Sequence, residues 1–265
     1  AQSSGFSSQR TEAAEVQSTA DITEILTPDD RVKLDKRDDM AFYQNPRIVQ
    51  HVDDIFLKQL TTLYRKRLVE NSAVLDLCSS HDSHLPDDVE YAEVIGHGMN
   101  EVELKANNRL TSYFVRDFDK NPRIDLPDSS IDAVLMCASI QYMARPEVLF
   151  LEMLRVLRPG GVVIISFSDR MFYSKAIQRW RVLDDFQRAK LVRSYFQNTG
   201  GFTRPEIIRS VPLPGDPEVD PIFRGIGGLV TDLARAVKKG GVPDPFTAVV
   251  AYKEFKPESV YSPMP

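Results

Sequence analysis

The sequence has little of three things that would point to common classes of protein. Its two cysteines, Cys78 and Cys137, are too few and too far apart for a disulfide scaffold or a zinc site. No apolar run approaches the roughly 20 residues that cross a membrane as a helix. A net charge of −5 leaves no basic excess, which argues against a surface that tracks nucleic-acid phosphates. No metal site is predicted.

The N-terminal part of the chain also lacks a sustained apolar period. Residues 1–40 are rich in serine, threonine, glutamine and acidic residues, which is typical of an extended or disordered arm. The chain starts at Ala1 without a methionine. This is expected of an organellar protein whose transit peptide has been removed, and equally of a sequence that is cut at an arbitrary boundary. Residues 41–265 form the second predicted unit, with a helical insertion at about 217–243.

Strands and helices alternate through the second unit. Apolar residues at helical spacing predict a long helix from Pro46 to Tyr64. The strands are continuously apolar, which is typical of a parallel sheet covered by helices on both faces. The expected strands are 73–78, 91–95, 112–115, 131–137, 162–167, 206–211 and 246–252, and the later helices are 146–157, 171–180 and 184–199.

A polar turn without glycine follows the first predicted strand. Asp76 stands near the end of that strand, and Cys78, Ser80 and Asp82 occupy spaced positions where nucleotide-binding turns usually carry glycine. The position indicates the cofactor edge of a Rossmann-like sheet. The absence of glycine indicates either a specialised site or a site that has lost its ligand.

The order of these segments resembles the class I S-adenosylmethionine-dependent methyltransferases over about residues 42–254. The most specific part is LPDSSIDAVLMCASIQYMARPEVLFLEMLRVLRPGGVVIISF, which is similar to the fourth strand, the next helix and the fifth strand of that superfamily. The resemblance implies a Rossmann-like α/β fold with a seven-stranded, mostly parallel sheet. It also implies S-adenosylmethionine as the cofactor.

A closer resemblance is to an uncharacterised branch of this superfamily, found in bacteria and photosynthetic eukaryotes. Its glycine-poor first motif, DLxSSxxSHLP, corresponds to DLCSSHDSHLP in this chain. The missing glycines are therefore a property of the branch. His81 and Asp82 depart from the residues expected within the motif, and Gly98 stands where the superfamily has a ribose-binding acid. The branch's distribution favours the chloroplast over the mitochondrion, with the cytoplasm as the alternative.

The resemblance assigns cofactor contacts to the ends of the first four strands. The assigned residues are Asp76, Cys78, Ser79, Ser80, Asn100, Asp117, Phe118 and Ser139. Asp76, Ser79 and Ser80 would face the amino acid end, and Cys78 would line the cofactor edge of the sheet, with burial as a small apolar side chain as its alternative. Asn100 would face the ribose, Asp117 and Phe118 the adenine, and Ser139 the methyl group. Each polar residue has a structural alternative, such as a helix cap for Asn100 or a solvated loop for Asp117.

Two residues are candidates for catalysis. Tyr142 follows the fourth strand, where the superfamily places residues beside the transferable methyl group, and covering the core is its alternative role. His51 lies in the segment expected to close over the cofactor and could act as a base. A structural histidine satisfied by its neighbours is the alternative.

Two functions follow from these observations. The first is S-adenosylmethionine-dependent methyl transfer to a small molecule or a protein. The second is a non-catalytic methyltransferase-like subunit or assembly factor of a larger organellar complex, which Gly98 and the extended arm favour. Residues 1–40 and the amphipathic stretch 221–241 are candidate surfaces for a protein partner.

Overall fold

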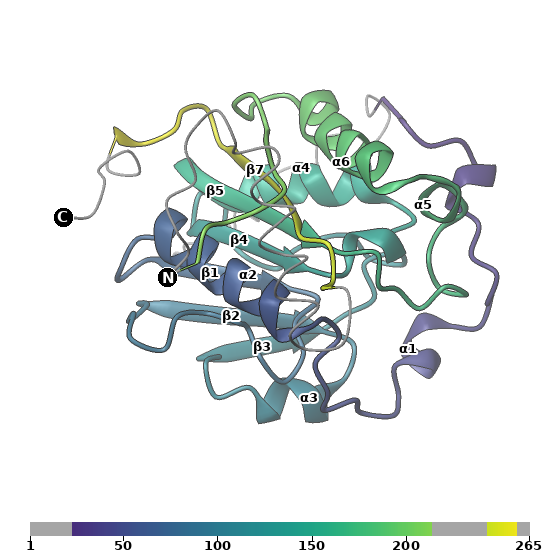
Figure 1. Cartoon of the computed structure of the whole chain (residues 1–265), viewed down its shortest axis with the longest axis horizontal. Coiled ribbons are helices and arrows are strands. Elements are labelled where there is room, and N and C mark those ends of the chain that lie inside the picture. Colours follow the sequence, from purple (N-terminus) through teal and green to yellow (C-terminus); the bar gives the residue numbers. More distant parts are fainter. Residues whose placement is uncertain (1–22, 214–242, 259–265) are drawn as a thin grey trace, which may run out of the picture.

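One seven-stranded sheet organises the computed structural model, which describes residues 23–213 and 243–258 (Figure 1). The strand order is β3-β2-β1-β4-β5-β7-β6. All strands run parallel except β7, which is antiparallel to both of its neighbours. The predicted Rossmann-like fold with a mostly parallel, seven-stranded sheet is confirmed. The predicted stretch 221–241 lies outside the described residues.

The elements follow the predicted alternation closely. The strands are β1 (Ala73–Leu77), β2 (Glu93–Gly98), β3 (Ser112–Val115), β4 (Ile131–Cys137), β5 (Leu157–Phe167), β6 (Glu206–Ile208) and β7 (Thr247–Tyr252). The helices are α1 (Asp39–Phe42), α2 (Asp54–Arg67), α3 (Glu101–Ala106), α4 (Pro146–Val156), α5 (Gln178–Val182) and α6 (Asp185–Thr199), with short 3-10 turns at Asp29–Arg31 and Ile140–Tyr142. In residues 23–213 and 243–258, none of these helices is long and apolar enough to cross a membrane.

Alternate residues of the central strands face two separate apolar layers. Leu75 and Val163 belong to the layer that contains side chains of α4 and α6. Val74 and Ile164 belong to the layer that contains side chains of α2. Because helices cover both faces of the sheet, the inner strands are apolar at nearly every position. This explains why their sequences show runs rather than alternation.

The helix predicted from Pro46 begins instead at Asp54. The carboxylate of Asp53 accepts a hydrogen bond from the N–H of Phe56 at 2.8 Å and so caps α2. The apolar residues before this cap do not continue the buried face, since Ile48 is 52% exposed. The helix predicted over 171–180 is likewise shorter and begins at Gln178.

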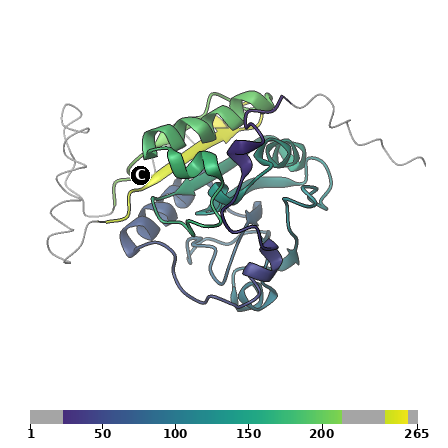
Figure 2. The ribbon, with the colours of Figure 1, turned by 90° about the vertical axis from the view of Figure 1, so that its right-hand side faces the viewer.

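The described part of the predicted arm, residues 23–40, lies along the domain (Figure 2). Leu26 is buried in the core. Arg31 pairs with Glu147 of α4 at 2.9 Å. The buried amine of Lys175 donates to two backbone carbonyls and one carboxylate of this segment. Within the described residues, the segment is therefore extended but packed on the sheet domain.

Candidate functional site

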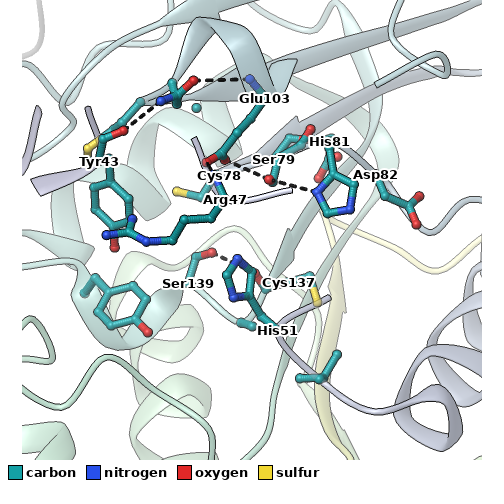
Figure 3. A pocket seen from close by; sticks show the side chains of 18 of the residues that line it. Tyr43, Arg47, His51, Cys78, Ser79, His81, Asp82, Glu103, Cys137 and Ser139 are labelled. Atoms are coloured by element: carbon teal, nitrogen blue, oxygen red, sulfur yellow. Dashed lines mark hydrogen bonds between the residues drawn. The ribbon is translucent and has the colours of Figure 1, made fainter. Parts of the chain in front are cut away.

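A cavity of about 300 Å³ lies at the carboxyl ends of β1, β2 and β4 (Figure 3). Ligands of open α/β sheets bind at this edge, next to the point where the strand order reverses. Eight of the ten predicted site residues line it: His51, Asp76, Cys78, Ser79, Ser80, Asn100, Ser139 and Tyr142. The structure does not bring the other two, Asp117 and Phe118, to the cavity wall.

The glycine-free turn after β1 is held by a buried histidine of β2. Cys78 has a φ of 57°, the left-handed conformation that glycine usually supplies. Its N–H donates to Nδ1 of His97 at 3.1 Å, so the ring proton is on Nε2, which donates to the carbonyl of Arg116 at 2.9 Å. Burial lowers the pKa of His97 to about 4. A neutral imidazole therefore fixes the turn without glycine.

Gly98 is required by the close approach of this turn. A Cβ atom at position 98 would lie 2.7 Å from the backbone carbonyl oxygen of Ser79. That separation is shorter than any ordinary van der Waals contact. A ribose-binding acid at position 98 is therefore incompatible with the turn in this conformation.

Glu103 places a carboxylate in the cavity close to Gly98. It belongs to the first turn of α3 and is only 8% exposed. Its two oxygens accept hydrogen bonds from the Ser80 hydroxyl at 2.7 Å and from the Arg47 backbone N–H at 2.6 Å. Each carboxylate oxygen keeps further accepting capacity. Glu103 was not among the predicted site residues, although its position three residues after the capping Asn100 is a signal for an acid at a helix start.

Asp76 carries an unsatisfied acceptor at the end of β1. The side chain is 4% exposed, and its Oδ2 has no hydrogen-bond partner among the described residues. Burial raises the pKa of Asp76 to about 6, against the lowering effect of the nearby Ser79 and Ser83 hydroxyls, which leave Oδ2 unpaired. A buried acceptor left without a donor is costly, so this oxygen is suited to a donor from a ligand in the cavity.

Asn100 caps α3 and also forms hydrogen bonds with the segment that contains Tyr43 and Gln44. Its Oδ1 accepts the N–H groups of Val102 at 2.9 Å and Glu103 at 3.2 Å. Its Nδ2 donates to the carbonyls of Tyr43 at 2.8 Å and Gln44 at 3.0 Å. The capping alternative is therefore present in the structure. A direct contact of Asn100 with a cofactor stays a prediction.

Asp117 and Phe118 follow β3 but are engaged by the chain itself. Asp117 accepts the N–H of Asp119 at 3.0 Å. The Phe118 ring lies 3.9 Å from the His97 ring, centroid to centroid. Asp119 pairs with Lys33 at 2.7 Å. The adenine contacts of Asp117 and Phe118 therefore stay predictions.

The predicted catalytic residues and Ser139 are neutral side chains of the cavity wall. The Tyr142 hydroxyl accepts the N–H of Phe172 at 2.8 Å, and burial raises its pKa. His51 meets Phe172 edge-on, with 5.7 Å between ring centroids, and burial lowers its pKa. The Ser139 hydroxyl donates to the carbonyl of Cys137 at 2.7 Å.

Asp82 and His84 form a carboxylate–imidazole pair in the cavity wall, which was not predicted from the sequence. Nδ1 of His84 lies 3.0 Å from Oδ2 of Asp82, and Gln50 donates to the same oxygen at 3.1 Å. Hydrogen bonding to His84 holds the pKa of Asp82 well below its usual range. With Nδ1 directed at the carboxylate, Nε2 is the basic nitrogen. The departure of Asp82 from the branch motif therefore supplies a partner for His84.

Both cysteines line the cavity as neutral thiols. Burial raises the pKa of Cys78 and of Cys137 to about 12. Neither is a thiolate near neutral pH, so neither is suited to nucleophilic chemistry there. Within the described parts of the chain, no group of three histidine, cysteine or acidic side chains is arranged to hold a metal ion.

Comparisons with known proteins find one matching domain model and several similar structures. The sequence model of a methyltransferase domain matches residues 84–165. The structure is similar to the complex of the Haloferax volcanii Trm112 methyltransferase activator with a putative methyltransferase, with a TM-score of 0.54, 18% identity, and coverage of 76% of this chain and 92% of that chain. An S-adenosylmethionine-dependent methyltransferase from Mesorhizobium loti has a TM-score of 0.46 and 17% identity, covering 72% of this chain and 96% of that one. The sequence matches no curated protein.

Proposed function

We propose that this chain is a class I S-adenosylmethionine-dependent methyltransferase, and that it transfers a methyl group from S-adenosylmethionine to a small molecule held in the cavity. The observation that carries the proposal is the Oδ2 of Asp76. It is buried without a partner at the end of β1, in the wall of the cavity. An ammonium group of a bound amino acid would satisfy it.

The cavity residues fit the cofactor at its amino acid and ribose ends. Asp76 would accept from the ammonium group, and the Ser79 hydroxyl lies in the same wall. Glu103 would accept from ribose hydroxyls, since an ionised carboxylate forms strong hydrogen bonds with such donors. When bound, the cofactor supplies an electrophilic methyl group. The adenine contacts of Asp117 and Phe118 stay predictions.

The segment over the cavity favours a small acceptor over a protein. Residues 43–51 contribute several wall side chains, and Asn100 and Glu103 hold this segment by backbone hydrogen bonds. The cavity walls would orient the acceptor, which is the main requirement for an in-line transfer. His84 would accept the acceptor's proton at Nε2, and Asp82 would stabilise the resulting imidazolium.

A non-catalytic subunit is the second candidate function. Asp117 and Phe118, which were predicted to bind adenine, lie outside the cavity wall. If the chain offers adenine no other contacts, the domain would serve as a scaffold for a partner and would bind no cofactor.

Calorimetric titration with S-adenosylhomocysteine separates the two candidates. We expect saturable binding to the unmodified chain and a loss of about 10- to 100-fold in affinity for Asp76→Asn. Asp88→Asn is the matched control, because Asp88 is paired with Arg65 at the surface and lies outside the cavity wall. Absence of both heat and a thermal shift at millimolar ligand would favour the scaffold.

A further inference from the structure

Arg47 is a cation in the cavity wall that no described acid neutralises. Its backbone N–H donates to Glu103 at 2.6 Å, and its Nη2 donates to the carbonyl of Phe42 at 3.2 Å. Its Nη1 is buried and has no hydrogen-bond partner in the described parts of the chain. Leaving a buried donor unpaired costs about 1–3 kcal/mol. The guanidinium therefore lacks an acceptor that a ligand could provide.

Three acids of the cavity wall bond to other groups, and the fourth, Asp76, forms no ion pair with Arg47 among the described residues. Glu103 accepts from a hydroxyl and a backbone N–H, Asp82 pairs with His84, and Asp39 pairs with Lys33 and Lys175. None of these carboxylates forms an ion pair with the guanidinium. Its positive charge therefore remains available inside the cavity.

Aromatic rings surround this guanidinium. Its Cζ lies 4.7 Å from the Phe42 ring centroid, 5.6 Å from that of Tyr43 and 5.0 Å from that of Phe172. The Tyr142 ring stacks on Phe172 with 6.0 Å between centroids. Rings exclude water and lower the local dielectric, which strengthens a charge-assisted hydrogen bond.

The guanidinium lies beside the Tyr43 ring in the cavity wall. In Figure 3 it is farther from Ser79 and Asp82 than from Tyr43, and Cys78 of the β1 turn lies between them. Burial lowers the pKa of His51, Glu103 raises it, and the Arg47 charge lowers it further. The contacts of the guanidinium itself are with the rings of Phe42, Tyr43 and Phe172.

We propose that the methyl acceptor is a small planar molecule with a carboxylate, and that Arg47 binds this carboxylate while Phe172 and Tyr142 contact its apolar body. That this molecule is a methyl acceptor rests on the proposed function. Guanidinium N–H groups match a carboxylate in geometry and charge. A dianionic phosphate fits less well, because Asp76, Asp82 and Glu103 line the same cavity.

Matched fragment pairs test this assignment. Benzoate is compared with benzamide, and phenylacetate with phenylacetamide, by ligand-observed NMR titration with and without saturating S-adenosylhomocysteine. We expect each carboxylate to bind about tenfold more tightly than its amide, and Arg47→Met to reduce the difference to within about twofold. Arg47→Lys keeps the charge but not the fork of donors, so an intermediate preference is expected.

Arg109→Met is the matched control for the loss of a guanidinium. Arg109 lies 5.8 Å from the Tyr91 ring and donates to the carbonyl of Val89 at 2.8 Å, outside the cavity wall. It should keep the full carboxylate preference. Thermal unfolding of each variant establishes that it is folded.

Several outcomes would overturn the assignment. These are equal affinities for acid and amide, no binding of either, tighter binding of phenyl phosphate, or a preference that survives in Arg47→Met. A tenfold loss of S-adenosylhomocysteine affinity in Arg47→Met without any fragment preference would assign Arg47 to the cofactor instead. Because the pairs are also measured without S-adenosylhomocysteine, failure of cofactor binding would contradict the proposed function alone.

Discussion

The two ends of the predicted cofactor site differ, although both follow parallel strands of the same sheet. After β1, Asp76 faces the cavity with a free acceptor. After β3, Asp117 is almost as buried, at 8% exposed against 4%, yet it lies outside the cavity wall. At the first end an acceptor of the cavity wall has no partner, whereas at the second end Asp117 and Phe118 contact other residues of the chain.

This difference shows that a strand end alone does not make a binding residue. The first end is shaped by a neighbouring strand, because His97 anchors the turn. At the second end the contacts include a residue distant in the sequence, because Lys33 donates to Asp119 across 86 positions. His97 takes part in both ends, since its ring also contacts Phe118.

Removing the residue shared by the two ends should have the largest effect. His97→Ala leaves the Cys78 N–H and the Arg116 carbonyl unpaired and opens a void beside Phe118. We expect the free energy of unfolding to fall by about 3–5 kcal/mol in urea titrations at pH 7. His51→Ala is the control, because His51 lies in the cavity wall at a position open to solvent and outside the apolar core. A loss below about 1 kcal/mol would show that the turn is held by other contacts.

The same variant should also change the dependence of stability on pH. In the folded chain His97 has a pKa of about 4, against 6.5 for an ordinary histidine. The unfolded chain therefore binds an extra proton between these values, and the stability from this group falls as the pH is lowered from 6.5 to 4. Asp76 titrates in the opposite sense over much of this range. The difference between the unmodified chain and His97→Ala isolates the histidine.

Ligand affinity compares the two ends directly. Asp76→Asn should weaken S-adenosylhomocysteine by about 10- to 100-fold, because a charge-assisted hydrogen bond is lost. Asp117→Asn should change it by less than about threefold, because Asp117 does not line the cavity. Calorimetric titration of both variants measures the contrast. Similar losses in the two would mean that the β3 end opens when ligand binds.

Adding a methyl group at Gly98 tests how closely the turn approaches β2. In Gly98→Ala, the new Cβ would clash with the Ser79 carbonyl. We expect a loss of about 1–3 kcal/mol in the free energy of unfolding, together with weaker S-adenosylhomocysteine binding. Val102→Ala, an exposed change nearby on α3, should cost much less. Unchanged stability in Gly98→Ala would show that the turn can move aside.

The ion pair at the second end should give the smallest effect. A double-mutant cycle of Lys33→Met and Asp119→Asn should yield a coupling energy of about 1 kcal/mol, because both side chains are mostly buried. The exposed pair of Lys120 and Asp38 provides a matched cycle with a smaller coupling. Equal couplings would mean that the Lys33 contact adds nothing specific to this end.

The limits of the sequence-based predictions follow from particular residues. The strands β3 and β4 were predicted with their observed bounds, because runs of apolar residues between polar turns mark buried strands. The helix over residues 46–64 was predicted to begin too early. The helical spacing of apolar residues extends back to exposed side chains such as Ile48, which lie before the true start of the helix. Arg47, Glu103 and His84 were missed because loops and a helix, rather than strand ends, bring them to the cavity.

The sequence by itself determined the class of fold and the edge of the sheet where the cavity lies. Apolar runs separated by helices leave few arrangements other than a parallel sheet covered on both faces, and the carboxyl ends of its strands then share one edge. Only the tertiary structure decided which residues at that edge reach the cavity. Asp76 belongs to β1 and lines the cavity, whereas Asp117 follows β3 and does not. Contacts between distant parts of the chain, such as the ion pair of Lys33 with Asp119, depend on how the chain packs, which no local pattern encodes.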